Sequence, residues 1–573
     1  MKHFLFALFV FIPLLSSSQT NPPYLNEESY SYTELISTHK ELAKTSELIE
    51  LKEIGLSDIG KKIHLTVISK DKNFTPELAR KNGKSIVLIN NGIHAGESCG
   101  IDASVELVKN LIDPKSEIHK ALDSIVVLIV PVYNVGGMLN RGAYSRANQV
   151  GPKEHGFRGN AKNLDLNRDF IKLDSRNAKT FTKLFRTWDP DVFVDTHTTN
   201  GSDHQYTLTL IATQKDKLNP VLSAFAEHEM IPTFYTKMSD RYMDMIPYVY
   251  TLKKSPDQGI KDFLETPRYS SGYASLFDCF SFITEAHVYK PFSQRVKHTI
   301  GFLEVMINYT ASNSSIIQEK RREAKKYTRN QKKFPIQWEL DSTRFKEIQF
   351  NGYSTEQRVS ELTGQEMMFY NKEKPFYRPI KYYNSYKPVV EVTKPSYYVV
   401  PQAYENVIER LNLNGVELQR LKNDTLIETE TYYIKNYKSP NKPYEAHFLH
   451  SKIQVEKKRE QHQFYDGDVL IKTNQRANRY IVETLEPHSS DGFFAWNFFE
   501  GILQQKEYFS DYAFEPKAKK FLEEHPEIKK EFEQKKATDE VFAKDSWTQL
   551  YYIYKKSPYY EKTVNRFPVY RIK

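Results

Sequence analysis

The chain has 573 residues, of which 39% are hydrophobic and 27% are charged, and this composition is that of a globular protein long enough for about two to four domains. The net charge of +9 is small for this length and is spread along the chain, so we expect no nucleic-acid partner. The two cysteines, Cys99 and Cys279, are too few for a disulfide-rich scaffold or a cysteine-based zinc site, and the sequence leaves open whether they pair.

Residues 1–18 have the pattern of a secretory signal peptide. A basic start precedes an apolar run from Phe4 to Leu15, and three serines follow. This pattern predicts cleavage after Ser18 and a secreted or periplasmic mature protein. The run is shorter than the roughly 20 residues of a membrane span, and no later stretch reaches about 18 apolar residues without charges. We therefore expect no membrane span in the mature chain.

Strands and helices alternate through the first half of the chain. In chain order, the predicted elements are a helix within 28–50, strands at 63–70 and 85–89, a helix at 100–112, a strand at 124–134 and a helix at 174–187. The ranges 190–201 and 280–291 are each predicted as a strand followed by a loop. This alternation predicts an α/β domain over residues 19–312, with a mixed, mostly parallel sheet flanked by helices.

The second half of the chain has a different pattern. Residues 313–335 are rich in charge, and we predict that they form a helical linker. We predict that residues 336–573 form an appended α+β region of unknown role. Its expected elements are strands at 389–401, 424–437, 444–455 and 467–472, and helices at 403–415 and within 517–543. Its tyrosines and basic residues could wall a cleft of the first domain or hold it near a partner.

One loop carries a metal-binding pattern. In NNGIHAGES, His94 and Glu97 stand three residues apart directly after a predicted strand, although a lone H-x-x-E is more often a loop histidine beside a solvated acid. A hydrolytic zinc site needs three protein ligands and an open position. His197 and Glu285 also stand at the carboxyl ends of predicted strands, where open α/β sheets place their sites.

These motifs resemble the zinc carboxypeptidase family of the pancreatic type. The zinc-binding H-x-x-E of that family matches His94 and Glu97, and its third ligand matches His197 in VDTHTTNG, with His204 as the rival. Its catalytic glutamate matches Glu285 in FITEA. The resemblance therefore implies one Zn²⁺ per chain and a zinc carboxypeptidase-like fold.

The resemblance extends over about residues 28–312 and includes a substrate-binding motif. In NLDLNRDF, Asn167 and Arg168 match the pair that binds the substrate carboxylate, and Asp165 matches the partner of the first zinc histidine. The planar guanidinium of arginine pairs bidentately with a carboxylate. The resemblance thus implies a peptide substrate with a free C-terminal carboxylate.

Two parts of the family pattern differ or cannot be placed by spacing. Gly96 stands where the pancreatic enzymes have an arginine, so contacts to the upstream part of the substrate must differ. Arg146 is our choice for the arginine that stabilises the oxyanion, with Arg158 as the competitor. Tyr269 and Tyr273, in PRYSSGY, are the candidates for the family's mobile tyrosine.

Each of these residues also has a structural interpretation. Glu285 could form a salt bridge at the edge of the core, Asp165 could cap a helix, and Arg168 could pair with Asp169 or Asp174 at the surface. We predict a secreted metallocarboxypeptidase that uses a zinc-activated water and a glutamate base. The alternatives are a zinc-dependent amidase acting on acylated amino acids or cell-wall peptides, and a non-catalytic binding protein with a relic site.

Overall fold

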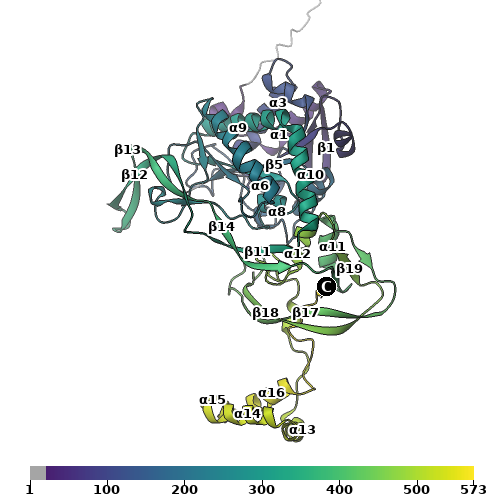
Figure 1. The fold of residues 1–573 in the computed structure, drawn as a ribbon. Helices are drawn as coiled ribbons and strands as arrows, with labels where there is room; N and C mark the ends of the chain where they lie inside the picture. Colours follow the sequence, from purple (N-terminus) through teal and green to yellow (C-terminus); the bar gives the residue numbers. More distant parts are fainter. Residues whose placement is uncertain (1–20, 200) are drawn as a thin grey trace, which may run out of the picture.

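The structure of the protein is a computed structural model that describes residues 21–199 and 201–573 (Figure 1). The predicted signal peptide, residues 1–18, lies outside these two stretches. Among the helices that the structure describes, none has both the length and the hydropathy needed to cross a membrane.

A mixed sheet of eight strands forms the centre of the first half of the chain. The strands are β1 (Ile49–Leu56), β2 (Lys62–Ile68), β3 (Ser85–Asn91), β4 (Ile125–Val130), β5 (Val192–Thr199), β6 (Leu208–Ala212), β7 (Met245–Pro247) and β10 (Phe280–His287). Their spatial order is β1-β2-β4-β3-β5-β10-β6-β7. The four central strands are parallel to one another, and β2 and β6 flank them in antiparallel orientation. The predicted α/β class with a mixed, mostly parallel sheet is confirmed.

Helices and short turns connect these strands. They are η1 (Pro23–Asn26), α1 (Tyr32–Thr45), α2 (Pro76–Lys81), α3 (Cys99–Ile112), η2 (Glu117–Asp123), α4 (Val135–Leu139), η3 (Leu166–Arg168), α5 (Arg176–Trp188), α6 (Pro220–Phe225), η4 (Ala226–Met230), α7 (Ile231–Ser239), η5 (Pro256–Gln258), α8 (Ser270–Ser275), α9 (Phe292–Ser312) and α10 (Ser314–Asn330).

Helices cover both faces of the sheet. Every residue of β3 and β4 is buried, as expected for aliphatic strands packed on both sides. Successive side chains point to opposite faces. Ile86 and Leu88 therefore pack in a cluster with α5 and α8, whereas Val87 and Ile89 pack in a second cluster with α3 and α9.

The segment predicted as a charged helical linker, residues 313–335, is mostly helical but is not separate from the sheet domain. Its helix, α10, packs on the sheet domain, and Ile317 is buried in the cluster with α3 and α9. The buried Arg321 donates to Asp189 at 2.9 Å and to Asp191 at 2.7 Å. A buried guanidinium requires such partners. One of the charges that suggested a solvated linker, that of Arg321, thus pairs with the buried Asp191 and the partly buried Asp189, while the wider division into domains stays a prediction.

The second half of the chain forms three smaller sheets. A two-stranded sheet joins β11 (Lys333–Leu340) and β14 (Tyr386–Thr393). A four-stranded sheet contains β8 (Tyr250–Thr251), β9 (Ile260–Lys261), β12 (Lys346–Val359) and β13 (Glu366–Tyr383). A six-stranded sheet contains β15 (Tyr397–Val400), β16 (Gln419–Arg420), β17 (Thr425–Lys438), β18 (Ser451–Phe464), β19 (Val469–Lys472) and β20 (Tyr570–Ile572).

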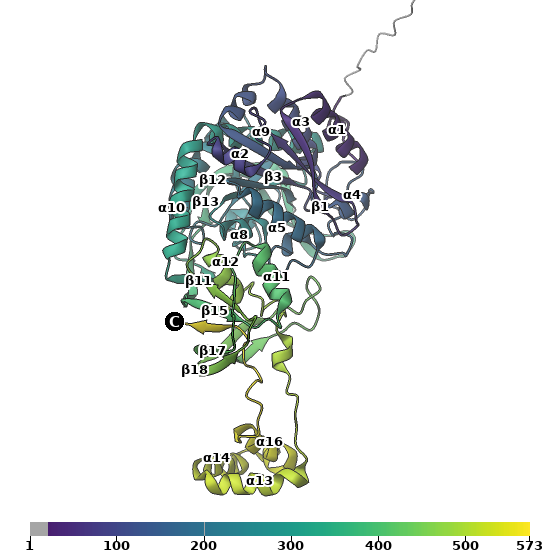
Figure 2. The same ribbon diagram turned by 90° about the vertical axis from the view of Figure 1, so that its right-hand side faces the viewer.

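The remaining helices belong to two groups. The first group packs near the six-stranded sheet and consists of α11 (Glu405–Leu413), α12 (Asn478–Leu485) and η6 (Glu500–Leu503). The second is α13 (Asp511–Glu524), α14 (Pro526–Thr538), α15 (Glu540–Lys544) and α16 (Ser546–Lys556). Figures 1 and 2 show this second group as a separate lobe that two chain segments join to the body.

Two features of the second half differ from the sequence-based expectation. The β12–β13 hairpin was not predicted, and it adds to β8 and β9, which come from the first half of the chain. The strand expected over 444–455 begins only at Ser451. The residues before it form a loop that reaches back to the first half.

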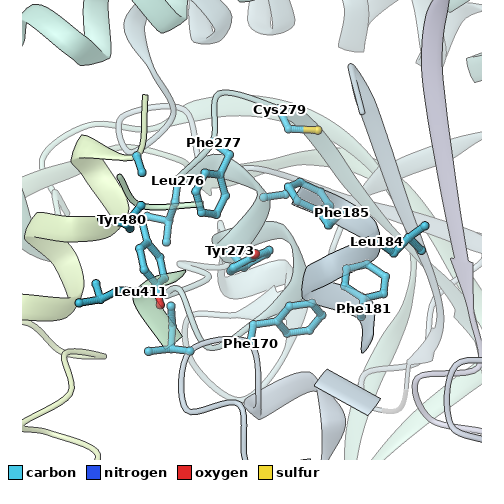
Figure 3. Packing of buried hydrophobic residues seen from close by; sticks show 14 of the residues in the cluster. Phe170, Phe181, Leu184, Phe185, Tyr273, Leu276, Phe277, Cys279, Leu411 and Tyr480 are labelled. Carbon is cyan, nitrogen blue, oxygen red and sulfur yellow. The ribbon is translucent and has the colours of Figure 1, made fainter. Parts of the chain in front are cut away.

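One hydrophobic core crosses the boundary between the two halves (Figure 3). Phe185 and Phe277, from the sheet domain, belong to the same buried cluster as Leu411 of α11 and Tyr480 of α12. The rings of Phe277 and Tyr480 stack with centroids 5.7 Å apart. The helices α11 and α12 of the C-terminal region are therefore packed against the sheet domain as part of its core, whereas the α13–α16 lobe has a separate core of its own.

Candidate active site

The pairing of the central strands brings the metal-binding motif together. In the β3–β5 register, Asn91 lies opposite Thr196, so the loop after β3 begins beside His197. Gly100, at the start of α3, allows close approach, because a Cβ there would lie 1.9 Å from Oγ1 of Thr196. The loop that carries His94 and Glu97 is thereby held against the end of β5.

The three predicted ligands meet with their donor atoms facing one another. Nδ1 of His94 lies 3.0 Å from Oε1 of Glu97, and Nδ1 of His197 lies 3.0 Å from Oε2 of the same carboxylate. The three side chains are buried, and one ligand atom from each lies within 4.8 Å of the others. Two imidazole nitrogens and a carboxylate are a donor set that suits zinc.

A carboxylate holds the far nitrogen of each histidine. Nε2 of His94 donates to Asp165 at 2.9 Å, as the resemblance implied, and Nε2 of His197 donates to Asp195 at 3.0 Å. With the proton held at Nε2, the lone pair of Nδ1 is available to a metal. Sequence analysis missed Asp195, although two residues of spacing on a strand place both side chains on one face.

Glu285 lies beside His197 on the neighbouring strand. The parallel register of β10 and β5 sets these two residues directly opposite each other. Burial raises the pKa of Glu285 to about 7. For Glu97, burial opposes ionisation, but the charges of His94 and Arg146 hold its pKa well below the usual range. The pKa of Glu285 is therefore that of a group that transfers protons, whereas the lowered pKa of Glu97 is that of an anionic metal ligand.

A cavity of about 220 Å³ joins these residues to the predicted substrate-binding residues. Its lining residues are His94, Glu97, Arg146, Arg158, Asn167, Arg168, His197, Thr198, Thr199, Ile211, Tyr248, Phe263, Tyr269, Ile283 and Glu285. The cavity therefore combines the metal ligands, the candidate base and three arginines with several apolar side chains.

Gly96 makes room for one of the three arginines. A Cβ at this position would lie 2.7 Å from Cδ of Arg146 and 2.6 Å from the carbonyl oxygen of Gly156. The side chain of Arg146 therefore passes through the space that a side chain at position 96 would occupy. Its Nη1 donates to Oε1 of Glu97 at 3.3 Å. This packing requires glycine at the position before the metal-binding glutamate, because a larger residue would clash with Arg146 and Gly156.

The competing arginine, Arg158, also lines the cavity. Its Nε and Nη2 both donate to Oδ2 of Asp165, at 3.1 and 2.8 Å, and its Nη1 lies 3.7 Å from Glu97. Arg146 is more enclosed, with 15% of its side chain exposed against 47% for Arg158. Both remain candidates for stabilising an oxyanion, and the choice of Arg146 stays a prediction.

Asn167 and Arg168 lie on η3, which faces the cavity. Asn167 is fixed at both ends, since its N–H donates to Asp165 at 2.8 Å and its Oδ1 accepts from the N–H of Ser270 at 2.9 Å. The guanidinium of Arg168 lies over the ring of Tyr269 at 4.3 Å. The structure thus brings Asn167, Arg168 and Tyr269 together beside the metal ligands.

Tyr273, the other candidate tyrosine, is not at the site. It is fully buried in the core that Figure 3 shows, and its hydroxyl donates to Asn414 at 2.7 Å. The helix α8 turns it away from Tyr269, toward Phe170 and Phe277. In its place the cavity has Tyr248, which no sequence motif marked. Burial, with a contribution from the nearby Glu285, raises the pKa of Tyr248 to about 12.

Three other residues that the sequence left open also lie outside the ligand cluster. His204, the rival for third ligand, is not among the described groups that could hold a metal, and its ring stacks on His287 at 4.2 Å. Cys99 and Cys279 are both buried free thiols. Neither thiol is paired with the other.

Metal content tests this ligand set directly. We expect one zinc per chain in the purified protein and loss of that zinc in His197→Ala, because two ligands bind zinc far more weakly than three. The matched control is His204→Ala, which should keep its zinc. Unchanged zinc in the folded His197→Ala protein, measured by elemental analysis, would show that another residue is the third ligand.

Known proteins are similar to this chain in sequence and in structure. A zinc carboxypeptidase family model matches residues 35–369. Carboxypeptidase 2 of Trichophyton rubrum is 19% identical over 471 residues, which cover 79% of this chain and 81% of the relative. A metallo-carboxypeptidase from Pseudomonas aeruginosa is 15% identical, with a TM-score of 0.39, over 50% of this chain and 70% of that one. Carboxypeptidase A from Helicoverpa armigera is 16% identical, with a TM-score of 0.36, over 52% and 78%.

The family match covers more than half of the chain and includes every residue of the metal cluster and cavity. It ends within β13, beyond the boundary near residue 312 that the resemblance suggested. The chain therefore belongs to the zinc carboxypeptidase family and is a metallopeptidase hydrolase.

Proposed function

We propose that this enzyme removes residues from the C-terminus of peptides, with one zinc ion held by His94, Glu97 and His197 and with Glu285 as the general base. The observation that carries the proposal is the single cavity of about 220 Å³ in which Arg168 faces the same space as the metal ligands. One bound peptide would place its cleaved bond near the zinc and its terminal carboxylate against Arg168.

Proton transfer is the proposed role of Glu285. When bound, a zinc ion lowers the pKa of a coordinated water towards about 7 and polarises the scissile carbonyl. Glu285 would take the proton of the attacking water and pass it to the leaving nitrogen. Its pKa of about 7 supports this role, since a group near the working pH both accepts and donates a proton readily.

In the transition state, negative charge develops on the carbonyl oxygen of the cleaved bond, and a hydrogen-bond donor must stabilise it. Arg146 lies in the cavity close to Glu97 and is largely enclosed. A positive charge aimed at a developing anion in a site shielded from water typically contributes about 3–4 kcal/mol. Arg146 is our proposed donor, while Arg158 would hold Asp165 in place through its paired hydrogen bonds.

Replacing Glu285 with Gln separates the base from the metal site. The amide keeps the shape of the side chain but cannot accept the proton, so kcat should fall about 10²-fold or more while zinc content stays at one per chain. Glu304→Gln, on α9 and outside the cavity, is the control and should keep full activity. Wild-type kcat in Glu285→Gln would reject Glu285 as the base.

Matched peptides with free and amidated C-termini test the substrate class. The largely buried Arg168 favours an anionic partner, so amidation should cost about 2–5 kcal/mol in transition-state binding, or roughly thirty- to several-thousand-fold in kcat/KM. Arg168→Ala should lose most of this discrimination and keep its zinc. Arg176→Ala, an exposed arginine at the start of α5, is the control.

Equal wild-type rates on the two peptides would reject the carboxypeptidase proposal. An amidase that releases an amine from acylated amino acids would be the next hypothesis, because it needs the zinc site and the base but tolerates an uncharged C-terminus. Such an enzyme should then cleave an N-acylated amino acid and the C-terminal amide of that compound at equal rates, and both faster than either peptide.

We also propose that the enzyme is exported, on the basis of the apolar run before Ser18. If the full chain is expressed in a secreting host, the exported protein should begin at Gln19, because small residues precede the expected cleavage point. N-terminal sequencing checks this. A chain that stays in the cells with its first residues intact would contradict export.

A further inference from the structure

A loop of the C-terminal region reaches the substrate side of the cavity. Residues 444–447, between β17 and β18, lie against the segment that carries Asp165 and Arg168. Nε of Arg168 donates to the hydroxyl oxygen of Tyr444 at 2.9 Å. The N–H of Asp165 donates to Glu445 at 2.7 Å. More than 270 residues of chain separate the members of each pair.

The loop makes a third contact on the same segment. Nε2 of His447 donates to Oδ2 of Asp174 at 2.8 Å, so the contacts of Tyr444, Glu445 and His447 extend along residues 165–174. The buried Lys172 also donates to Asp174, at 2.9 Å. The segment that carries the carboxylate-binding pair is therefore held by three side chains of this loop.

The backbone of this loop is strained. Tyr444 and His447 pair with each other through two backbone hydrogen bonds, which leaves a two-residue turn. The turn residues, Glu445 and Ala446, have φ of +52° and +66°. Glycine and asparagine are the usual residues there, because a side chain is disfavoured at positive φ. A strained turn of this kind persists only where its surroundings hold it, and here the three contacts do so.

The ring of Tyr444 is backed by other groups of the C-terminal region. It stacks on the fully buried Trp496, with centroids 6.2 Å apart and planes 18° apart. Arg268, which donates to Asp491 at 2.7 Å, lies 5.8 Å from the centroid of the Tyr444 ring. The hydroxyl of Tyr444, a residue that is 37% exposed, is therefore presented to Arg168 by a ring that packs against Trp496 and Arg268.

These contacts hold the guanidinium of Arg168 in one orientation. Tyr444 accepts from Nε, the carbonyl oxygen of Asn167 accepts from Nη1 at 2.7 Å, and the ring of Tyr269 covers one face. An arginine side chain is long and flexible, so ordering it before the substrate binds removes the conformational entropy that would otherwise be lost on binding. The Nη2 end, which has no part in these contacts, can face a carboxylate in the cavity.

We propose that Tyr444 is a positioning residue for Arg168, and that the loop 444–447 makes the C-terminal region a required part of the carboxylate-binding site. This inference rests on the proposed function of Arg168. It assigns a role to a region whose sequence carries no recognised chemical motif, and it gives the strained turn a function.

The test is Tyr444→Phe, which removes the hydroxyl and keeps the stacked ring. For a peptide with a free C-terminus, KM should rise about five- to thirty-fold, with a much smaller change in kcat, since a hydrogen bond that orients a binding group is lost. The amidated peptide should be affected less than twofold. Zinc content should stay at one per chain.

Two further variants distinguish positioning from a general structural effect. Tyr433→Phe removes a hydroxyl that donates to Glu460 at 2.9 Å on the β17–β18 ribbon, away from the cavity, and should leave both peptides unaffected. In an Arg168→Ala background, Tyr444→Phe should cause no further rise in KM, because the hydroxyl acts through that guanidinium.

The outcomes separate this inference from the proposed function. If the wild type prefers the free acid but Tyr444→Phe keeps the same KM, or if KM rises equally for both peptides, the positioning role is wrong and the carboxypeptidase proposal stands. An additional rise in KM in the Arg168→Ala background would also overturn it. If the wild type shows no preference for the free acid, the proposed function fails, and the inference fails with it.

Discussion

The parallel pairing of β3, β5 and β10 is the constraint on which the site depends. Parallel strands end at the same edge of a sheet, so the loop after β3, the end of β5 and the end of β10 deliver His94, His197 and Glu285 to one place. The register sets Glu285 opposite His197. Close contact between Gly100 and Thr196 then fixes the loop against β5, and the metal ligands need no large rearrangement to meet.

Charge compensation explains much of what surrounds these ligands. Glu97 is buried between two imidazoles and beside Arg146, and a buried carboxylate without such partners would be protonated. Asp165 and Asp195 in turn hold the outer nitrogens of the histidines. In contrast, Glu285 has no arginine hydrogen-bonded to it in the described residues, and burial raises its pKa. The environments of the two glutamates therefore differ in the way that their proposed roles require.

The C-terminal region contributes to this arrangement from a distance in sequence. Its helices α11 and α12 complete the core in which Tyr273 and Phe277 are buried, and that core lies directly behind α8. Because Ser270, at the start of α8, donates to Asn167, the position of the substrate-binding pair depends on packing with the second half of the chain. The loop 444–447 contacts Arg168, one member of this pair, and the neighbouring Asp165. The helical lobe α13–α16 has no such contact and stands apart (Figure 2).

The fold class, the family and the residues of the metal cluster could be predicted from the sequence, because local patterns encode them. Apolar runs and periodicity mark strands and helices, and the H-x-x-E, the DTH and the TEA segments each follow a predicted strand. Which tyrosines face the cavity could be seen in the folded chain alone, since Tyr269 and Tyr273 stand four residues apart and the turn into α8 sends them to opposite sides. That α10 is part of the core could also be seen only in the folded chain, because the partners of Arg321 lie about 130 residues away. Tyr248 and Tyr444 were missed for a related reason. Their contacts come from strand pairing and from packing between the two halves of the chain, and no local pattern records which distant segments will meet.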